Sequence, residues 1–246
     1  MRNIKLTIEY DGSRYQGWTR LGKDESGNTI SNKIIEVLRK MTGEYLCELH
    51  CGCRTEVGVH AYLQVANFKT ECSMTTKEIQ HYLNRYLPMD IAVTKVEEKP
   101  ERFHAQLNAL SKTYVYRITI DEVPSVFDRR YIYHSFKIPD KKVMQQAALS
   151  LIGTHDFRNF SSVKKSKSTV KTIYDLDIYA DIEEMLITIK ADDFLHNMAR
   201  ILIGTLLDIG LGIRKKEEIE EIFAGNLPAS NPCDPKGLYL QEVSYE

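Results

Sequence analysis

The chain has few of the residues that would cross-link it or carry it into a membrane. It contains 5 cysteines, 7 prolines and 1 tryptophan among 246 residues. The cysteine number is odd and the spacing fits no secreted disulfide framework. Cys51 and Cys53 form a C-x-C without the second pair that a zinc site needs, so we expect no metal. The longest apolar stretch, 198–212, is interrupted by Arg200 and Asp208, which argues against a membrane span.

A signal peptide and an excess of charge are also missing. The N-terminal residues MRNIKLTIEY alternate in polarity, so they lack an apolar signal core and predict a strand in a cytoplasmic protein with reduced thiols. Lys plus Arg number 33 and Asp plus Glu 34, giving a net charge of -1. An anionic partner would therefore have to be held by a local basic patch and not by the field of the whole molecule.

What the chain does have is an ordinary globular composition, with 43% hydrophobic and 27% charged residues. Its patterns of apolar residues mix strands and helices without a regular βαβ alternation. They predict an α+β class with largely antiparallel sheets. A junction at residues 99–101 would separate an N-terminal domain, 1–100, from a C-terminal domain, 101–246. We expect strands at 4–8, 46–53, 62–68, 91–96, 109–120, 172–179, 185–190 and 238–245, and helices at 30–41, 76–87, 140–151, 194–211 and 215–223.

The segment 54–60, RTEVGVH, is the most informative part of the chain. It lies between two expected strands, and loops held by strands are common places for reactive groups. The carboxylate of Glu56 is two residues from Arg54, so it can be held ionised and aimed as a nucleophile or general base. A surface turn with a weak ion pair would have the same local pattern. Both interpretations stay open at this level.

Two further segments are rich in cations. Residues 102–120 contain no acid, and their aromatic and basic side chains suit stacking on unpaired bases, although each aromatic could equally belong to the core. Residues 158–171 carry five cations and no anion, which suits phosphate contacts or a solvated linker. The candidates in these segments are Phe103, His104, Lys112, Tyr114, Lys164, Lys165 and Lys167.

A fourth feature is the apolar helix expected to begin at residue 194. His196 and Arg200 are four residues apart, so we expect them on one face of this helix. An arginine in apolar surroundings needs an anion, which could be Glu56 or a structural carboxylate elsewhere. No glycine-rich phosphate loop, zinc motif or nucleophile elbow is present.

Taken in order, these pieces resemble the tRNA pseudouridine synthase A family. Residues 10–18, YDGSRYQGW, resemble its YDG-x3-GW motif, and 54–61, RTEVGVHA, resemble its RTDxGVHA motif. The match spans nearly the whole chain. The later motifs that it includes are FHA at 103–105, KTYVY at 112–116, FLHNMAR at 194–200 and GLYL at 237–240.

The resemblance implies the pseudouridine synthase fold, with two α+β halves joined across a pseudo-two-fold and a homodimer that binds tRNA. It implies no cofactor and no metal. The motif carboxylate, here Glu56, would attack a uridine of the anticodon stem-loop, in the region of positions 38–40, and the base would rejoin the ribose through C5. Arg200 would pair with the nucleophile, Tyr114 would stack on the base and could take up the C5 proton, and Arg54 would hold the flipped nucleotide. The candidate substrate-binding residues are Arg14, Arg54, His60, Phe103, His104, Lys112, Lys164, Lys165, Lys167, His196 and Leu238.

The sequence departs from the family pattern at its most important position, because Glu56 stands where the family has Asp. One methylene moves the carboxylate by about an ångström, which can cost around a hundredfold in rate. Thr19, Gln106 and the residues 233–236 also differ. Two hypotheses follow: an active isomerase whose site accommodates Glu56, or a tRNA-binding paralogue without chemistry. The retained Arg54, Tyr114 and Arg200 favour the first, and the other changes favour the second.

Overall fold

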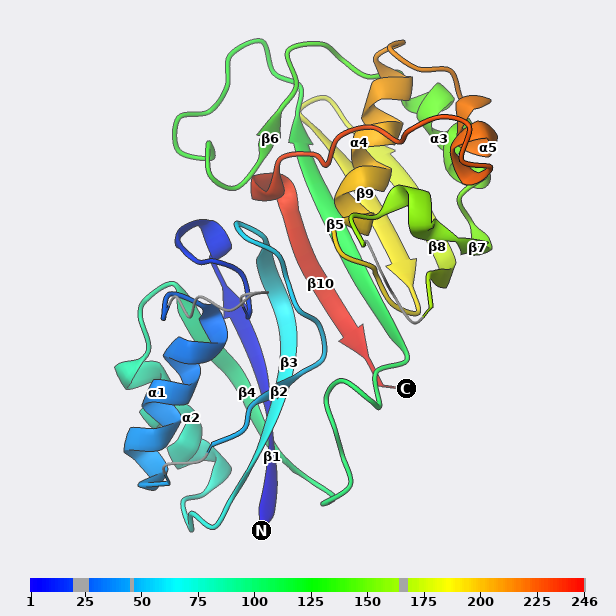
Figure 1. The fold of residues 1–246 in the computed structure, drawn as a ribbon. Coiled ribbons are helices and arrows are strands. Elements are labelled where there is room, and N and C mark those ends of the chain that lie inside the picture. Colours follow the sequence, from blue (N-terminus) through cyan, green and yellow to red (C-terminus); the bar gives the residue numbers. More distant parts are fainter. Residues whose placement is uncertain (20–26, 45–46, 164–167, 246) are drawn as a thin grey trace. The chain divides into compact units, whose positions relative to one another are not determined.

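The computed structural model describes residues 1–19, 27–44, 47–163 and 168–245. The chain forms two compact units: unit 1 comprises Met1–Leu110 and Leu240–Glu246, and unit 2 comprises Ser111–Tyr239. Both units combine helices with mostly antiparallel strands, which confirms the predicted α+β class (Figure 1). Within the described ranges, no helix is long and apolar enough to cross a membrane. The units group residues 101–110 and 240–246 with unit 1, whereas we predict a boundary at residue 100.

Unit 1 is a sheet covered on one face by two helices. Its strands run in the order β4-β1-β3, and the short strand β2 pairs with β3. Helices α1 and α2 lie side by side against the sheet (Figure 1). The elements are β1 (Arg2–Tyr10), α1 (Ile30–Thr42), β2 (His50–Cys51), β3 (His60–Thr70), α2 (Thr76–Tyr86), β4 (Ile91–Lys99) and, from Leu240 onward, β10 (Leu238–Ser244).

Helix ends in unit 1 are set by local chemistry that is visible in the sequence. The side chain of Thr29 caps α1, and Gly43 ends it with a left-handed φ of 73°. Thr75 and Glu78 form a capping box at the start of α2. These starts and stops confirm the predicted helices at 30–41 and 76–87.

The strand expected at 46–53 is wrong except at 50–51, since among the residues described there only β2 is a strand, followed by one further bond from the amide of Gly52 to the carbonyl of Val65 at 2.8 Å. After β2, a side-chain amide replaces the ladder. Gln64 accepts from the amide of Cys53 at 3.2 Å and donates to its carbonyl at 2.6 Å. The chain therefore leaves the sheet early and enters the segment 54–60 as a loop.

The turn after β4 is held on unit 1 by two buried asparagines. Asn67 donates to the Oδ1 of Asn3 at 2.9 Å and accepts from the amide of Ala105 at 2.8 Å. Asn3 donates to the carbonyl of Phe103 at 2.8 Å. The phenol of Tyr245 donates to the carbonyl of Ala105 at 2.7 Å. This asparagine clamp is the reason that residues beyond 100 pack with unit 1.

Unit 2 contains a second antiparallel sheet, in the order β5-β9-β8-β7, with β6 parallel to β5. Its apolar core includes Ile187 and Ile189 of β9, which pair with Tyr116 and Tyr114 on the neighbouring strand β5. Helices α3 and α4 pack on each other, and α3 also packs on β8 (Figure 1). The elements are β5 (Ser111–Thr119), β6 (Tyr133–His134), α3 (Lys141–Leu149), β7 (Gly153–Asp156), β8 (Val170–Ala180), β9 (Glu184–Ala191), α4 (Met198–Gly210) and α5 (Glu218–Phe223).

Helix α4 begins later than predicted. Asn197 has a left-handed φ of 61°, so the chain enters the helix only at Met198. Residue 194 is not helical because Phe194 lies in the turn that follows β9 and packs edge-on against Tyr114. His196 therefore lies before the helix and does not share a helical face with Arg200. That part of the prediction is wrong.

The asparagine clamp makes a direct prediction for stability. Asn67→Ala removes two buried hydrogen bonds and leaves the amide of Ala105 unpaired, so the free energy of unfolding should fall by about 2 to 4 kcal/mol. Urea denaturation followed by circular dichroism measures this. The half-exposed Asn32 of α1 offers a control, since Asn32→Ala should change stability by less than about 0.5 kcal/mol. Equal effects of the two substitutions would contradict the clamp.

Candidate functional site

The loop 54–60, called here the motif loop, connects β2 to β3 in unit 1. Its backbone is bound from outside by the amide of Trp18, which donates to the carbonyl of Thr55 at 3.0 Å, and is closed within the loop by the amide of Val59, which donates to the carbonyl of Glu56 at 3.2 Å. The Thr55 hydroxyl is buried and lies 2.7 Å from the phenol oxygen of Tyr10. Arg54 is exposed and Glu56 is half-buried. The loop thus presents its two charged side chains from an anchored backbone.

Two glycines of the segment 10–18 let it pack backbone-to-backbone against the motif loop. A Cβ added at Gly12 would lie 2.0 Å from the carbonyl oxygen of Val59. One at Gly17, which has a left-handed φ of 81°, would lie 2.6 Å from the carbonyl oxygen of Thr55. No other residue type fits either position without moving the loop. This contact explains why the two motifs occur together.

Two buried, uncharged side chains, Tyr10 and Gln64, support the motif loop through hydrogen bonds. Tyr10 and Gln64 are buried at 3% and 0% exposure, and the amide of Gln64 lies 3.4 Å from the Tyr10 oxygen. Burial raises the pKa of Tyr10 far above its ordinary value, so the phenol stays protonated. Because Gln64 also binds the backbone of Cys53, one amide joins the phenol to the start of the motif loop.

His60 closes the other end of the loop. Its side chain is buried, and its Nδ1 accepts from the amide of Gly12 at 3.1 Å and lies 3.2 Å from the Asp11 carboxylate. Asp11 also accepts from the amide of Ser13 at 2.8 Å and so orients the short helix η1 (Gly12–Arg14). These contacts tie His60 to the segment 10–18, which packs on the loop. Arg14, the last residue of η1, is exposed beside it.

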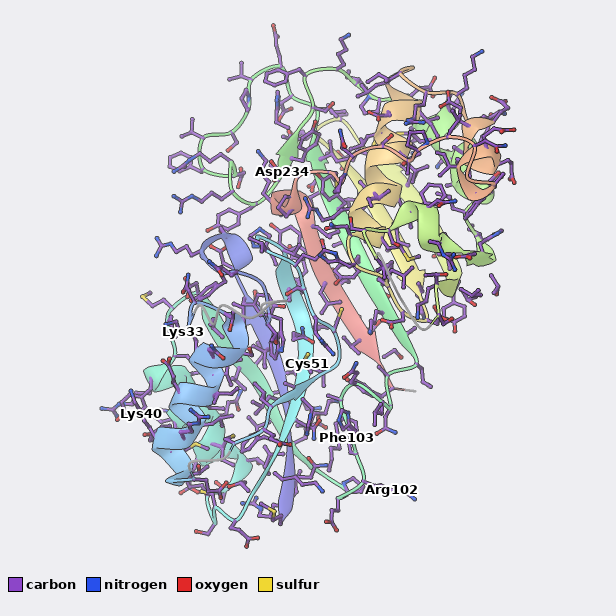
Figure 2. All side chains as sticks on the ribbon, in the orientation of Figure 1. Lys33, Lys40, Cys51, Arg102, Phe103 and Asp234 are labelled. Atoms are coloured by element: carbon purple, nitrogen blue, oxygen red, sulfur yellow. The ribbon has the colours of Figure 1, made fainter. Side chains whose placement is uncertain are left out.

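Phe103 and His104 lie on the turn that the asparagine clamp holds, next to Arg102 (Figure 2). The ring of Phe103 is 5.3 Å from that of Tyr245, and the imidazole of His104 is 4.3 Å from that of His50. Partial burial, followed by the neighbouring imidazole, lowers the pKa of His104, so it is neutral at pH 7. Two ring pairs therefore lie on this turn.

In unit 2, Lys112 and Tyr114 are placed by β5. Tyr114 is 6% exposed and meets Phe194 edge-on with ring centroids 5.0 Å apart. Lys112 forms an ion pair with Asp193, whose second oxygen is 3.5 Å from the ammonium of Lys171. Burial alone would raise the pKa of Asp193, but the two ammonium groups hold it below its usual range. The three ions carry a net positive charge two residues from Tyr114.

Arg200 is oriented in the first turn of α4. Its Nε donates to the carbonyl of Cys233 at 2.8 Å, and its Nη1 donates to the Oδ1 of Asn197 at 3.1 Å. The amide of Cys233 donates back to the Arg200 carbonyl at 3.0 Å. The loop carrying Cys233 approaches α4 closely, since a Cβ at Gly204 would lie 2.3 Å from the carbonyl oxygen of Asn231. Sequence reasoning missed Asn197 and Asp193, whose only signal is polarity at the ends of an apolar helix and strand.

The remaining candidates occupy different surroundings. His196 is exposed, and its carbonyl accepts from the amide of Ser162 at 2.9 Å. Leu238 is buried at 2% exposure. Lys164, Lys165 and Lys167 lie outside the described residues. Among the residues that are described, no three or more His, Cys, Asp or Glu side chains are placed to hold a metal ion.

The main candidates thus fall into two groups by the unit to which they belong. In unit 1, Arg54, Glu56 and His60 share the motif loop, and Arg14 lies beside it on η1. In unit 2, Lys112 and Tyr114 share β5, and Arg200 is oriented on α4. The first group offers a carboxylate on an anchored loop, and the second offers an aromatic ring and two cations.

Comparison with known proteins gives consistent matches. A family model described as tRNA pseudouridine synthase matches residues 6–108 and 147–246. The chain is 41% identical to tRNA pseudouridine synthase A 2 of Bacillus anthracis and 43% identical to tRNA pseudouridine synthase A 1 of Clostridium tetani, each over 248 residues and 100% of both chains. A solved H/ACA RNP with a bound substrate RNA aligns with 97% of this chain and 47% of its own, at 10% identity and a TM-score of 0.41. That last likeness is too distant to carry an argument.

The backbone contact at Gly12 makes a prediction for the loop. Gly12→Ala should push the backbone of Val59 away and loosen the motif loop, because neither backbone can yield as a side chain would. Hydrogen exchange should then accelerate by at least about tenfold at the amide of Trp18, which binds the loop, and at the amide of Val59, which closes its turn. Gly27→Ala is the matched control, since a Cβ there meets no atom within 4 Å. Unchanged exchange in Gly12→Ala would show that the contact does not hold the loop.

Proposed function

We propose a mechanism that starts from an established premise: the chain belongs to the tRNA pseudouridine synthase family and is an RNA isomerase. We propose further that it acts on uridines of the anticodon stem-loop, in the region of positions 38–40, with Glu56 as the nucleophile. The observation that carries this proposal is the anchored motif loop. It presents the carboxylate of Glu56 two residues from the exposed Arg54, on a backbone bound by Trp18 and packed against Gly12 and Gly17.

The reaction needs nothing beyond the carboxylate and groups that hold the nucleotide and move protons. The Glu56 carboxylate attacks the nucleotide and the glycosidic bond breaks, so the base is released from its ribose. The base turns, C5 bonds to the ribose and displaces the Glu56 carboxylate, which is thereby regenerated. The C5 proton is then removed while N1 is protonated. The product is an isomer of the substrate, so no redox or group-transfer partner is required.

Unit 2 would supply the groups that act on the nucleophile and the base. We propose that Arg200 pairs with Glu56, and that Tyr114 stacks on the base and takes up the C5 proton. The orientation of Arg200 by Cys233 and Asn197 supports the first role, because a fixed guanidinium needs no reorganisation when the carboxylate reacts. The edge-on contact with Phe194 likewise fixes the ring of Tyr114. In this proposal Glu56 lies within about 10 Å of Tyr114 and Arg200, about a Debye length at physiological salt.

The substrate would be held at several points along its backbone. Arg54 would hold the flipped nucleotide, with Arg14 close to it on η1. A homodimer would bind one tRNA. The other residues proposed to contact tRNA are His60, Phe103, His104, Lys112, Lys164, Lys165, Lys167, His196 and Leu238.

The second candidate function is an inactive tRNA-binding paralogue, and the changes at Thr19, Gln106 and Cys233 favour it. The structure weakens two of these three points. Cys233 binds Arg200 through its own main-chain amide and carbonyl, which any residue type supplies. The amide of Gln106 donates to His104 in the same way. The active enzyme is therefore the better supported proposal.

Substitutions of Glu56 separate enzyme from binder. Glu56→Gln keeps nearly the same volume and removes the charge, so pseudouridine formation should fall by at least about a thousandfold while the Kd for tRNA changes by less than about threefold. Glu56→Asp should lower activity by around a hundredfold in a site adapted to the longer side chain. Pseudouridine formed in unmodified tRNA and tRNA binding are measured on the same preparations.

Two outcomes would overturn this assignment. If the wild type is inert and Glu56→Asp gains activity, the chain is a decayed enzyme with a surviving scaffold. If the wild type and Glu56→Gln are equally active, another residue is the nucleophile.

The lysines at 164, 165 and 167 make a separate prediction for binding. Each phosphate contact that is lost should reduce the slope of log K against log salt by about one. Neutralising all three to Gln should therefore weaken tRNA binding and reduce the slope by about three if each lysine contacts a phosphate. Salt titrations of binding measure this. An unchanged slope would assign these lysines to a solvated linker.

A further inference from the structure

Aromatic, sulfur-containing and basic side chains lie at and just after the C-terminal end of α2: Tyr82, Arg85, Tyr86 and Met89. Together with Arg14 of η1, which a contact described below links to them, they are called here the α2-end surface. Met89 is 105% exposed and Tyr86 is 54% exposed. Single exposed apolar residues are ordinary, but a group of them beside cations is a common sign of an interaction site.

Two aromatic rings of this surface contact each other, and a guanidinium lies beside one of them. Tyr82 and Tyr86 are one helical turn apart, and their ring centroids are 4.6 Å from each other. The guanidinium of Arg85 lies 5.9 Å from the centroid of Tyr86. Half of Tyr86 stays open to solvent beyond these contacts. A planar π-surface next to a guanidinium is the combination that stacks on a nucleobase while binding phosphate.

The same surface is tied directly to the candidate site within unit 1. The amide of Asp11 donates to the carbonyl of Asp90 at 3.0 Å, and the phenol of Tyr15 donates to its carboxylate at 2.5 Å. Asp11 and Tyr15 flank η1, so Met89 and Arg14 are each one residue from this link. Gly12 of η1 in turn packs on Val59 of the motif loop. The α2-end surface is therefore continuous with the motif loop through two backbone contacts.

We propose that the α2-end surface binds the RNA strand that flanks the target nucleotide, with bases stacked on Tyr86 and Met89 and phosphates against Arg14 and Arg85. This proposal rests on the function proposed above. Charge favours RNA over an acidic or neutral protein surface, because the carboxylate of Asp90 is half-buried and accepts from Tyr15, while Arg14 and Arg85 are exposed. Continuity with the motif loop favours the strand next to the target over a distant part of the molecule.

The first test uses the double variant Tyr86→Ala, Met89→Ala on the full chain with unmodified tRNA. Loss of stacking should raise KM by about tenfold and leave kcat within about twofold, since these side chains touch no reacting atom. The single variant Tyr86→Phe, in which Met89 is unchanged, keeps the ring and should have the wild-type KM. The matched control is Tyr174→Ala, Ile182→Ala in unit 2, whose residues are 52% and 92% exposed and should leave KM unchanged. Equal KM values for the double variant, its control and the wild type would overturn the proposal.

The second test identifies the occupant directly. A photoreactive benzoylphenylalanine placed at Met89 should cross-link to tRNA, and the cross-linked nucleotide should lie within a few positions of the target uridine. Cross-links only to protein, or to a tRNA region far from the target, would overturn the proposal. Both tests are separable from the fate of the proposed function. If the wild type is inert, the proposed function is contradicted, and the cross-linking experiment still tests whether the α2-end surface binds RNA. If the wild type is active but the Met89 variant does not cross-link to tRNA, only the proposal for the α2-end surface is contradicted.

Discussion

Close contact between two stretches of main chain positions the carboxylate of Glu56, the proposed nucleophile. Gly12 and Gly17 let the N-terminal segment 10–18 lie directly on the carbonyls of Thr55 and Val59, where any side chain would intrude. The hydrogen bonds of Trp18, Tyr10 and His60 then act on a loop that is already confined. Glu56 inherits its place from this contact. The longer side chain of Glu56 therefore starts from a backbone whose position is fixed. Changes elsewhere in the site can accommodate the extra methylene only because that starting point does not move.

The two units prepare their groups in different ways. Unit 1 anchors backbone and leaves Arg54 exposed and Glu56 half-buried. Unit 2 fixes side chains: Arg200 is bound at two nitrogens, Tyr114 is held by a ring, and Lys112 is neutralised in part by Asp193. The pKa of Asp193 stays low in spite of burial because two ammonium groups face it, so the ion cluster persists at neutral pH. The supporting residues in unit 2 therefore hold charged and aromatic side chains in position, whereas those in unit 1 hold a loop in position.

Much of this arrangement could be predicted from the sequence, because it depends on local signals. Thr29, Gly43 and Thr75 are residue types that commonly cap helices, and they mark the ends of α1 and the start of α2. The motif loop can be recognised because it combines a cation, a carboxylate, a glycine and a histidine in seven residues. The errors come from contacts that local pattern does not carry. Asn197 starts α4 late through a left-handed backbone, and Gln64 shortens the strand near Cys53 from 11 residues away. Asn3 and Asn67 are 64 residues apart, and the sequence around each of them does not indicate that their side chains form a hydrogen bond. The meeting of Glu56 with Tyr114 and Arg200 depends on three distant segments and stays a prediction.

The asparagine clamp has a consequence for how the chain is made. Unit 1 consists of two pieces of sequence, and the second piece, Leu240–Glu246, follows the whole of unit 2. Tyr245 in that piece contacts Phe103 and donates to the carbonyl of Ala105, on the turn that Asn3 and Asn67 hold. On a ribosome, which releases the chain from its N-terminus, the sheet of unit 1 lacks β10 at the β3 edge until unit 2 has emerged, and only the short β2 pairs with β3 there. The hydrogen bonds of Asn3 and Asn67 lie within the first piece, so the clamp can hold the turn without the final strand.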